Sequence, residues 1–157
     1  MSKKYPVTPT QFINVLVTAI PHLDPKTGKT VYTTTFMPEA LRVVQPDTVI
    51  NYQLVGPTPA GVRFAAVTVT PDGTQFSTPS ISRSGKIVTF SDANTAAETL
   101  HITLHFTDSD GIGFDVDPEV TNDPQPTLAR AAALDGEGVR LAFMPEQGND
   151  PQPVKLA

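Results

Sequence analysis

Hydrophobic and polar residues alternate along several short stretches of the chain, with the period of two that is typical of β-strands. In the clearest stretch, Thr99 to Thr107, every second residue is large and apolar: Leu100, Ile102, Leu104 and Phe106. The residues between them include His101, Thr103 and His105. This pattern predicts a half-buried strand whose apolar face belongs to the core.

Other stretches predict further strands with different surroundings. Residues 50–54 and 139–143 alternate in the same way, whereas residues 12–20 are apolar on both faces, which predicts a central strand covered from two sides. In residues 62–70 the apolar phase changes, and a β-bulge at Ala65 and Ala66 would reconcile the two halves. Additional strands are expected at 31–36, 41–44, 86–90 and 112–116.

Turn-forming residues divide the chain into segments too short for ordinary helices. The sequence contains 16 prolines and 10 glycines, and residues 127–134, with three consecutive alanines, are the one short helix that we expect. Short strands separated by frequent turn signals are typical of a sandwich or barrel. We therefore predict an all-β, immunoglobulin-like Greek-key β-sandwich of about seven to nine strands. A single domain should cover residues 1–144, followed by a proline-rich tail at 145–157.

Composition limits the classes of function. The 157-residue chain has no cysteine, which excludes disulfides, thiolate nucleophiles and Cys-ligated metal centres. A net charge of −5 argues against nucleic acid and anionic membranes as partners. No run approaches the roughly 20 apolar residues of a membrane span, and no secretory leader is recognisable. We therefore expect a soluble cytoplasmic protein without a cofactor.

The most acidic segment, residues 108–119, is the best candidate for a metal site. It holds five carboxylates and two glycines in twelve residues, and calcium prefers such oxygen ligands. Counted as an EF-hand loop, its first, third, sixth and twelfth positions match, but its fifth and ninth do not. Solvated turns between strands explain the composition equally well. The candidate calcium ligands are Asp108, Asp110, Asp115 and Asp117.

The histidines and hydroxyl residues form no recognisable catalytic motif. On a strand, His101 and His105 would be about 13 Å apart, too far to share one ion, and His22 has no identified partner. The G-x-S-x-G elbow and the G-x-x-x-x-G-K-[ST] phosphate loop are both absent from the sequence. We therefore expect no enzymatic activity and assign no catalytic residue.

Two stretches resemble known families. Residues 35–52 look like the early strands of a cupredoxin, although Pro46 replaces a usual glycine and the copper ligand cluster is missing. The run GFDVDPEVTNDPQ, residues 113–125, resembles the DP-EP family of small bacterial proteins, and residues 12–20 and 47–54 suit the same pattern. The DP-EP resemblance implies an immunoglobulin-like sandwich without an assigned activity, and it carries over no functional residue.

Two classes of function remain open. The first is a non-enzymatic binding or self-assembly module whose partner is another protein or a second copy of the chain. Open sheet edges favour it, because residues 99–107 and 31–36 contain neither proline nor lysine to protect an edge. The second is a calcium-dependent or carbohydrate-binding module that uses residues 108–119. The absence of tryptophan argues against sugar binding.

Overall fold

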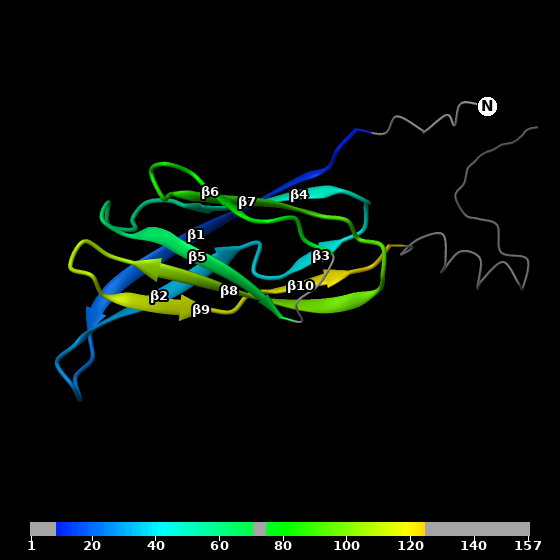
Figure 1. The fold of residues 1–157 in the computed structure, drawn as a ribbon. Coiled ribbons are helices and arrows are strands. Elements are labelled where there is room, and N and C mark those ends of the chain that lie inside the picture. The colour runs from blue at the N-terminus through cyan, green and yellow to red at the C-terminus, as the bar shows by residue number, and fades with distance from the viewer. Residues whose placement is uncertain (1–8, 71–74, 125–157) are drawn as a thin grey trace, which may run out of the picture. The chain divides into compact units, whose positions relative to one another are not determined.

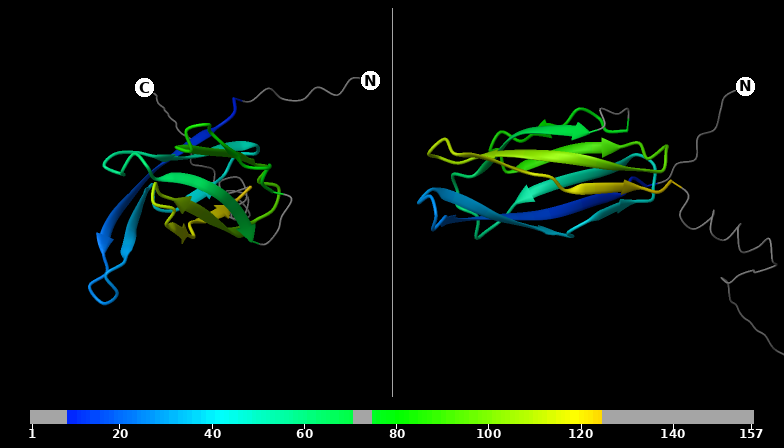
Figure 2. Two further views of the ribbon diagram at one scale, coloured as in Figure 1. Left: turned by 60° about the vertical axis from the view of Figure 1, so that its left-hand side comes forward. Right: turned by 90° about the horizontal axis from the view of Figure 1, so that it is seen from below.

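The computed structural model describes residues 9–70 and 75–124, which form two β-sheets with a shared core (Figure 1, Figure 2). Sheet A has the strand order β2-β1-β4-β7-β6. Its strands are β1 (Phe12–Leu23), β2 (Thr30–Met37), β4 (Thr48–Leu54), β6 (Ser80–Ile81) and β7 (Ile87–Asp92). Sheet B has the order β3-β10-β8-β5, and β9 pairs with β8. Its strands are β3 (Leu41–Val43), β5 (Arg63–Thr70), β8 (Glu98–Thr107), β9 (Gly113–Val116) and β10 (Glu119–Asn122). The predicted all-β sandwich is confirmed.

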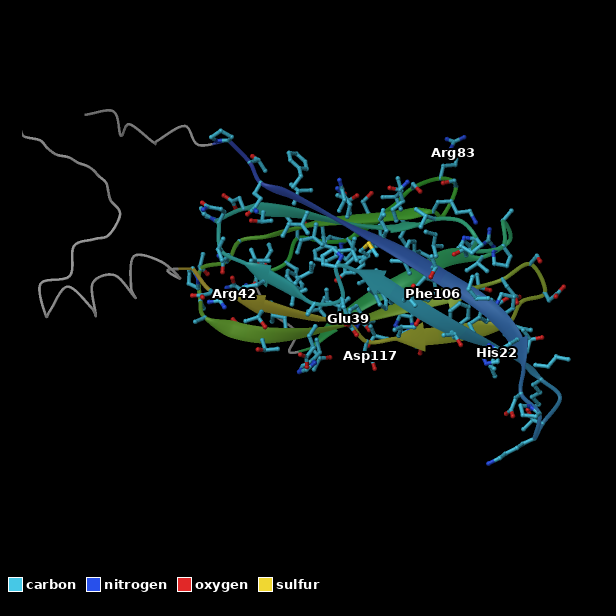
Figure 3. The ribbon with its side chains drawn as sticks, turned by 180° about the vertical axis from the view of Figure 1, so that it is seen from behind. His22, Glu39, Arg42, Arg83, Phe106 and Asp117 are labelled. Atoms are coloured by element: carbon cyan, nitrogen blue, oxygen red, sulfur yellow. The ribbon has the colours of Figure 1, made fainter. Side chains whose placement is uncertain are left out.

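Alternate residues of the central strands fill the space between the sheets. Strand β8 buries the four apolar residues predicted from its period of two, and β4 buries Ile50, Tyr52 and Leu54. Aromatic rings pack closely along sheet B, where Phe106 lies with its ring centroid 4.9 Å from those of Phe64 and Phe114 on the two neighbouring strands (Figure 3). The hydrophobic effect of this burial holds the two sheets together.

The predicted bulge in β5 is also confirmed. Phe64 lies opposite Phe106, but Ala66 lies opposite His105, so one extra residue is accommodated between them. This insertion keeps Phe64 buried and turns Val67 toward the core, although the two positions have opposite parity.

Several predictions about exposure and strand position were wrong. Residues 12–20 form a central strand, but only the inner side of β1 is covered, and Leu16 and Ile20 on its outer side are exposed. Strand β8 is not an open edge, because it pairs with β5 on one side and with β9 and β10 on the other. Strand β2 does form an edge of sheet A, as the sequence suggested.

The topology has features that the hydrophobic pattern did not predict. Strands β6 and β10 bring the number of strands in the described residues to ten. Two of the pairings are parallel, β1 with β4 and β3 with β10. The predicted helix at 127–134, the predicted strand at 139–143 and the tail at 145–157 lie outside the described residues. Within the part of the chain that the structure describes, no helix is long and apolar enough to cross a membrane.

Candidate functional site

Asp108, the first of the predicted calcium ligands, organises the turn between β8 and β9. Its Oδ1 accepts hydrogen bonds from the backbone N–H groups of Asp110 and Ile112, both at 2.9 Å. Its Oδ2 accepts a hydrogen bond from the hydroxyl of Tyr32, at 2.6 Å. These donors, Tyr32 first, lower the pKa of the Asp108 carboxyl below its usual value. The carboxylate therefore has structural partners on both of its oxygens.

Tyr32 connects this turn to the edge strand β2. Its ring stacks on Phe114 of β9, with centroids 4.2 Å apart. Burial, followed by the hydrogen bond to Asp108, raises the pKa of Tyr32 to about 12. The Tyr32 hydroxyl thus stays protonated and donates to Asp108 over the whole physiological range.

The other predicted ligands lie elsewhere along the β9 hairpin. Asp110 is in the turn itself, Asp115 points outward from β9, and Asp117 follows that strand (Figure 3). In residues 9–70 and 75–124, no three histidine, aspartate or glutamate side chains gather into a group that could hold a metal ion. The structure therefore does not bring the four carboxylates together, and calcium binding by this segment stays a prediction.

A row of hydrogen bonds crosses the outer side of sheet B, and the sequence analysis missed it. The Nδ1 atom of His105 lies 2.7 Å from Oδ1 of Asp115, and its Nε2 atom lies 3.2 Å from Oγ1 of Thr68. The order of groups is that of a hydrolase triad, but such catalysis also needs oxyanion donors and a bound substrate. One surface pocket is lined by the loop at 55–60, a second by residues that include Ser109, and a third by residues that include Phe36. His105 lines none of these three pockets. The row links three strands on an open surface.

The outer side of sheet A has a different character. Its outward positions are the even-numbered residues 12–22 of β1 and the odd-numbered residues 31–37 of β2, 49–53 of β4 and 87–91 of β7. We call this set the sheet A outer face. None of these positions holds Lys, Arg, Asp or Glu. A sheet surface without a formal charge is unusual in a chain whose remaining surface is acidic.

Exposed hydrophobic side chains concentrate on β1 and β2, and all of them except Leu23 lie on this face. The large hydrophobic residues that are exposed in the described part of the chain all lie in β1 or β2: Phe12, Leu16, Ile20, Leu23, Val31 and Met37. Leu16 and Met37 lie directly opposite each other across the two strands and are 40% and 70% exposed. In Figure 3, β1 crosses the front of the view, and His22 is labelled near its end.

Polar side chains on the same face are already paired with one another. Asn51 donates from Nδ2 to Oδ1 of Asn14, at 2.8 Å, and accepts from the hydroxyl of Thr89, at 2.6 Å. The hydroxyls of Thr18 and Thr35 are hydrogen-bonded across β1 and β2. Contact with a partner would therefore leave few polar groups without hydrogen bonds.

The sequence did contain a signal for this face. Residues 12–20 are apolar on both sides of the strand, a pattern that predicts a central strand covered from two sides. The described residues supply only one layer. The outward side chains of β1 therefore remain exposed in the part of the chain that the structure describes.

Comparison with known proteins identifies the family. The family model of the DP-EP family matches residues 11–124, which include every strand of the two sheets. The chain therefore belongs to the DP-EP family, as its resemblance at residues 113–125 suggested. No curated protein matches the sequence.

Proposed function

We propose that this member of the DP-EP family is a non-enzymatic self-assembly module in which a second copy of the chain covers the sheet A outer face. The observation that supports the proposal is the concentration of exposed Leu16, Ile20 and Met37 on a face without formal charge. Contiguous exposed apolar surface of this kind marks interaction sites on soluble proteins.

Hydrophobic burial would drive the association. Each Å² of apolar surface removed from water contributes about 25 cal/mol. Leu16 and Met37 form a cross-strand pair, and Ile20 lies on the same side of β1 as Leu16, with Thr18 between them. The backbone at these positions is already fixed by the pairing of β1 with β2, so covering it costs side-chain but not backbone conformational entropy.

Charge distribution favours a second copy as the occupant. Each chain carries a net charge of −5, so two copies repel each other wherever their charged surfaces meet. The sheet A outer face is a surface on which two copies can meet without burying a Lys, Arg, Asp or Glu side chain, and so without the cost of removing ions from water. An isologous dimer about a two-fold axis would use the same face of both copies.

The test is the oligomeric state of the full chain in solution, measured by sedimentation velocity from about 1 to 100 µM. We expect a concentration-dependent dimer for the wild type. Leu16→Glu should weaken association by at least about 100-fold. In a two-fold symmetric dimer, each copy would bury one unpaired carboxylate in the shared interface. Thr103→Glu places the same charge on the central strand of sheet B and should leave association unchanged. A wild-type protein that is monomeric at 100 µM would contradict the proposal.

The proposal also includes a cytoplasmic location. A chain without cysteine needs no oxidising compartment to fold. Fractionation of the native host, with the protein followed by an antibody, should recover it with cytoplasmic markers. Recovery with envelope or secreted fractions would contradict this part of the proposal.

A further inference from the structure

A cluster of buried polar side chains lies where β7 and β10 end. Asp92 is the last residue of β7, Asn122 is the last residue of β10, and Asn94 follows β7 by two positions. Their exposed fractions are 0%, 2% and 3%. Asn94 has a positive φ of 51°, a conformation that asparagine adopts more readily than most residues.

Hydrogen bonds fix the positions of these three side chains. Oδ1 of Asp92 accepts from the backbone N–H of Asn94, at 2.9 Å, and from Nδ2 of Asn122, at 2.8 Å. Nδ2 of Asn94 donates to the carbonyl oxygen of Gln45, at 3.4 Å. Both amide nitrogens are thereby used on protein acceptors.

Three oxygen atoms of the cluster receive no hydrogen bond from the protein. They are Oδ2 of Asp92, Oδ1 of Asn94 and Oδ1 of Asn122. Leaving a buried polar atom without a partner is unfavourable, so these three acceptors call for a partner that the protein does not supply. All three lack the same thing, an electropositive partner.

A neighbouring negative charge makes an electropositive partner for these oxygens more favourable. Glu98 pairs with Asn122 across β8 and β10 and adds a second negative charge close to the cluster. Burial, with a smaller contribution from Glu98, raises the pKa of the Asp92 carboxyl. In residues 9–70 and 75–124, no Lys or Arg side chain donates to the three oxygens.

The number of acceptors distinguishes the possible partners. A proton on Oδ2 of Asp92 would satisfy that atom and one amide oxygen, leaving the third unsatisfied. A water molecule has two hydrogens and would also leave one acceptor unsatisfied. A metal cation can contact three oxygens at once and neutralise the buried carboxylate.

We propose that Asp92, Asn94 and Asn122 form a binding site for a hard metal cation of the calcium class. A carboxylate oxygen combined with amide carbonyl oxygens is a ligand set that calcium uses in proteins. This site differs from residues 108–119, whose carboxylates the structure does not bring together. It also does not depend on self-assembly, because its residues face the interior of the sandwich.

Calcium binding by the chelator-treated full chain tests the site. Isothermal titration should detect one calcium ion per chain, and calcium at about 100 times its Kd should raise the Tm by roughly 10 °C. Asp92→Asn should abolish both effects, because it removes the only charged ligand of the three. Asp110→Asn, in the β8–β9 turn, is the matched control and should bind calcium like the wild type.

A second variant keeps the test decisive if Asp92→Asn does not fold. Asn94→Asp retains the side-chain oxygen and tolerates the left-handed backbone. By adding a carboxylate, it should lower the Tm without calcium and increase the rise that calcium produces. The proposal is overturned if calcium neither binds nor changes the Tm of the wild type. It is also overturned if Asp110→Asn, and not Asp92→Asn, removes the effect.

Discussion

The outer sides of the two sheets share the same strand geometry but differ in chemistry. On sheet B, ionisable side chains pair across strands, His101 with Glu119 at 3.4 Å and His105 with Asp115 at 2.7 Å. On sheet A, the corresponding positions hold hydrophobic and neutral polar residues and one histidine, His22, but no Lys, Arg, Asp or Glu. The outer side of sheet B carries the charged groups usual on a surface that faces water, whereas that of sheet A has the apolar character on which the proposed self-assembly rests.

Strands β1 and β8 make the comparison specific. Both are central strands, and both bury alternate residues in the same core, Val15, Val17 and Ala19 in the case of β1. Their outward residues differ in kind: in β8 they are threonine and histidine, and in β1 they include Phe12, Leu16 and Ile20. The inward residues therefore build the shared core, whereas the outward residues set the chemistry of each outer side.

The largest expected effect separates the inner side of β8 from its outer side. Ile102 is fully buried, so Ile102→Ala should lower the free energy of unfolding by about 2 to 5 kcal/mol. Thr103→Ala, on the outer side of the same strand, should cost less than about 1 kcal/mol. Urea denaturation of the two variants measures the difference. Similar losses at both positions would mean that the outer side of sheet B is also part of a packed interface.

A smaller effect is expected from Asp108, at the flank where β2 meets the β8–β9 turn. Because hydrogen bonds lower its pKa below 3.8, the unfolded chain binds the proton more tightly than the folded chain. The stability that Asp108 contributes is therefore complete above pH 3.8 and is lost as the pH falls through the lowered pKa. Asp108→Asn should make the free energy of unfolding fall less steeply between pH 5 and pH 2, by the contribution of one carboxyl group.

The control for this measurement is Asp117→Asn, which removes a carboxylate of the same segment without breaking the bond to Tyr32. Denaturation curves across this pH range should be flatter for Asp108→Asn than for Asp117→Asn. Equal curves for the two variants would show that Tyr32 and the two backbone donors do not hold the Asp108 carboxylate in solution.

The smallest expected effect concerns the row of hydrogen bonds on sheet B. His105 and Asp115 are 30% and 58% exposed, and solvent screens such pairs strongly. His105→Ala should therefore cost no more than about 1 kcal/mol, and added salt should reduce the difference from the wild type. A loss above about 2 kcal/mol would mean that a substitution on this face lowers the free energy of unfolding as much as one in the core.

The sequence predicted the central strands well because their side-chain periods are unambiguous. Strand β8, strand β4 and the bulge before Ala66 follow directly from alternating apolar residues. Strand β10 was missed because Glu119–Asn122 contains one apolar residue, Val120, and follows Pro118. Its position depends on pairing with β3 and β8, which no local pattern records.

The candidate sites were harder to predict for the same reason. The acidic residues of 108–119 are close in sequence, but a turn and an extended strand separate their carboxylates. Asp92 and Asn122 meet only because β7 and β10 end at neighbouring points, and the backbone N–H of Asn94 joins them at Asp92. Two of these three residues are amides, which a search for charged ligands passes over.

The absence of cysteine from the sequence permits a direct test of which face is covered. A single cysteine introduced as Thr18→Cys would lie on the sheet A outer face, and one introduced as Thr103→Cys would lie on the outer side of sheet B. With a short bismaleimide at micromolar protein concentration, Thr18→Cys should give covalent dimers in high yield and Thr103→Cys only the background of random collisions. Equal yields from the two variants, or a higher yield from Thr103→Cys, would contradict self-assembly through sheet A.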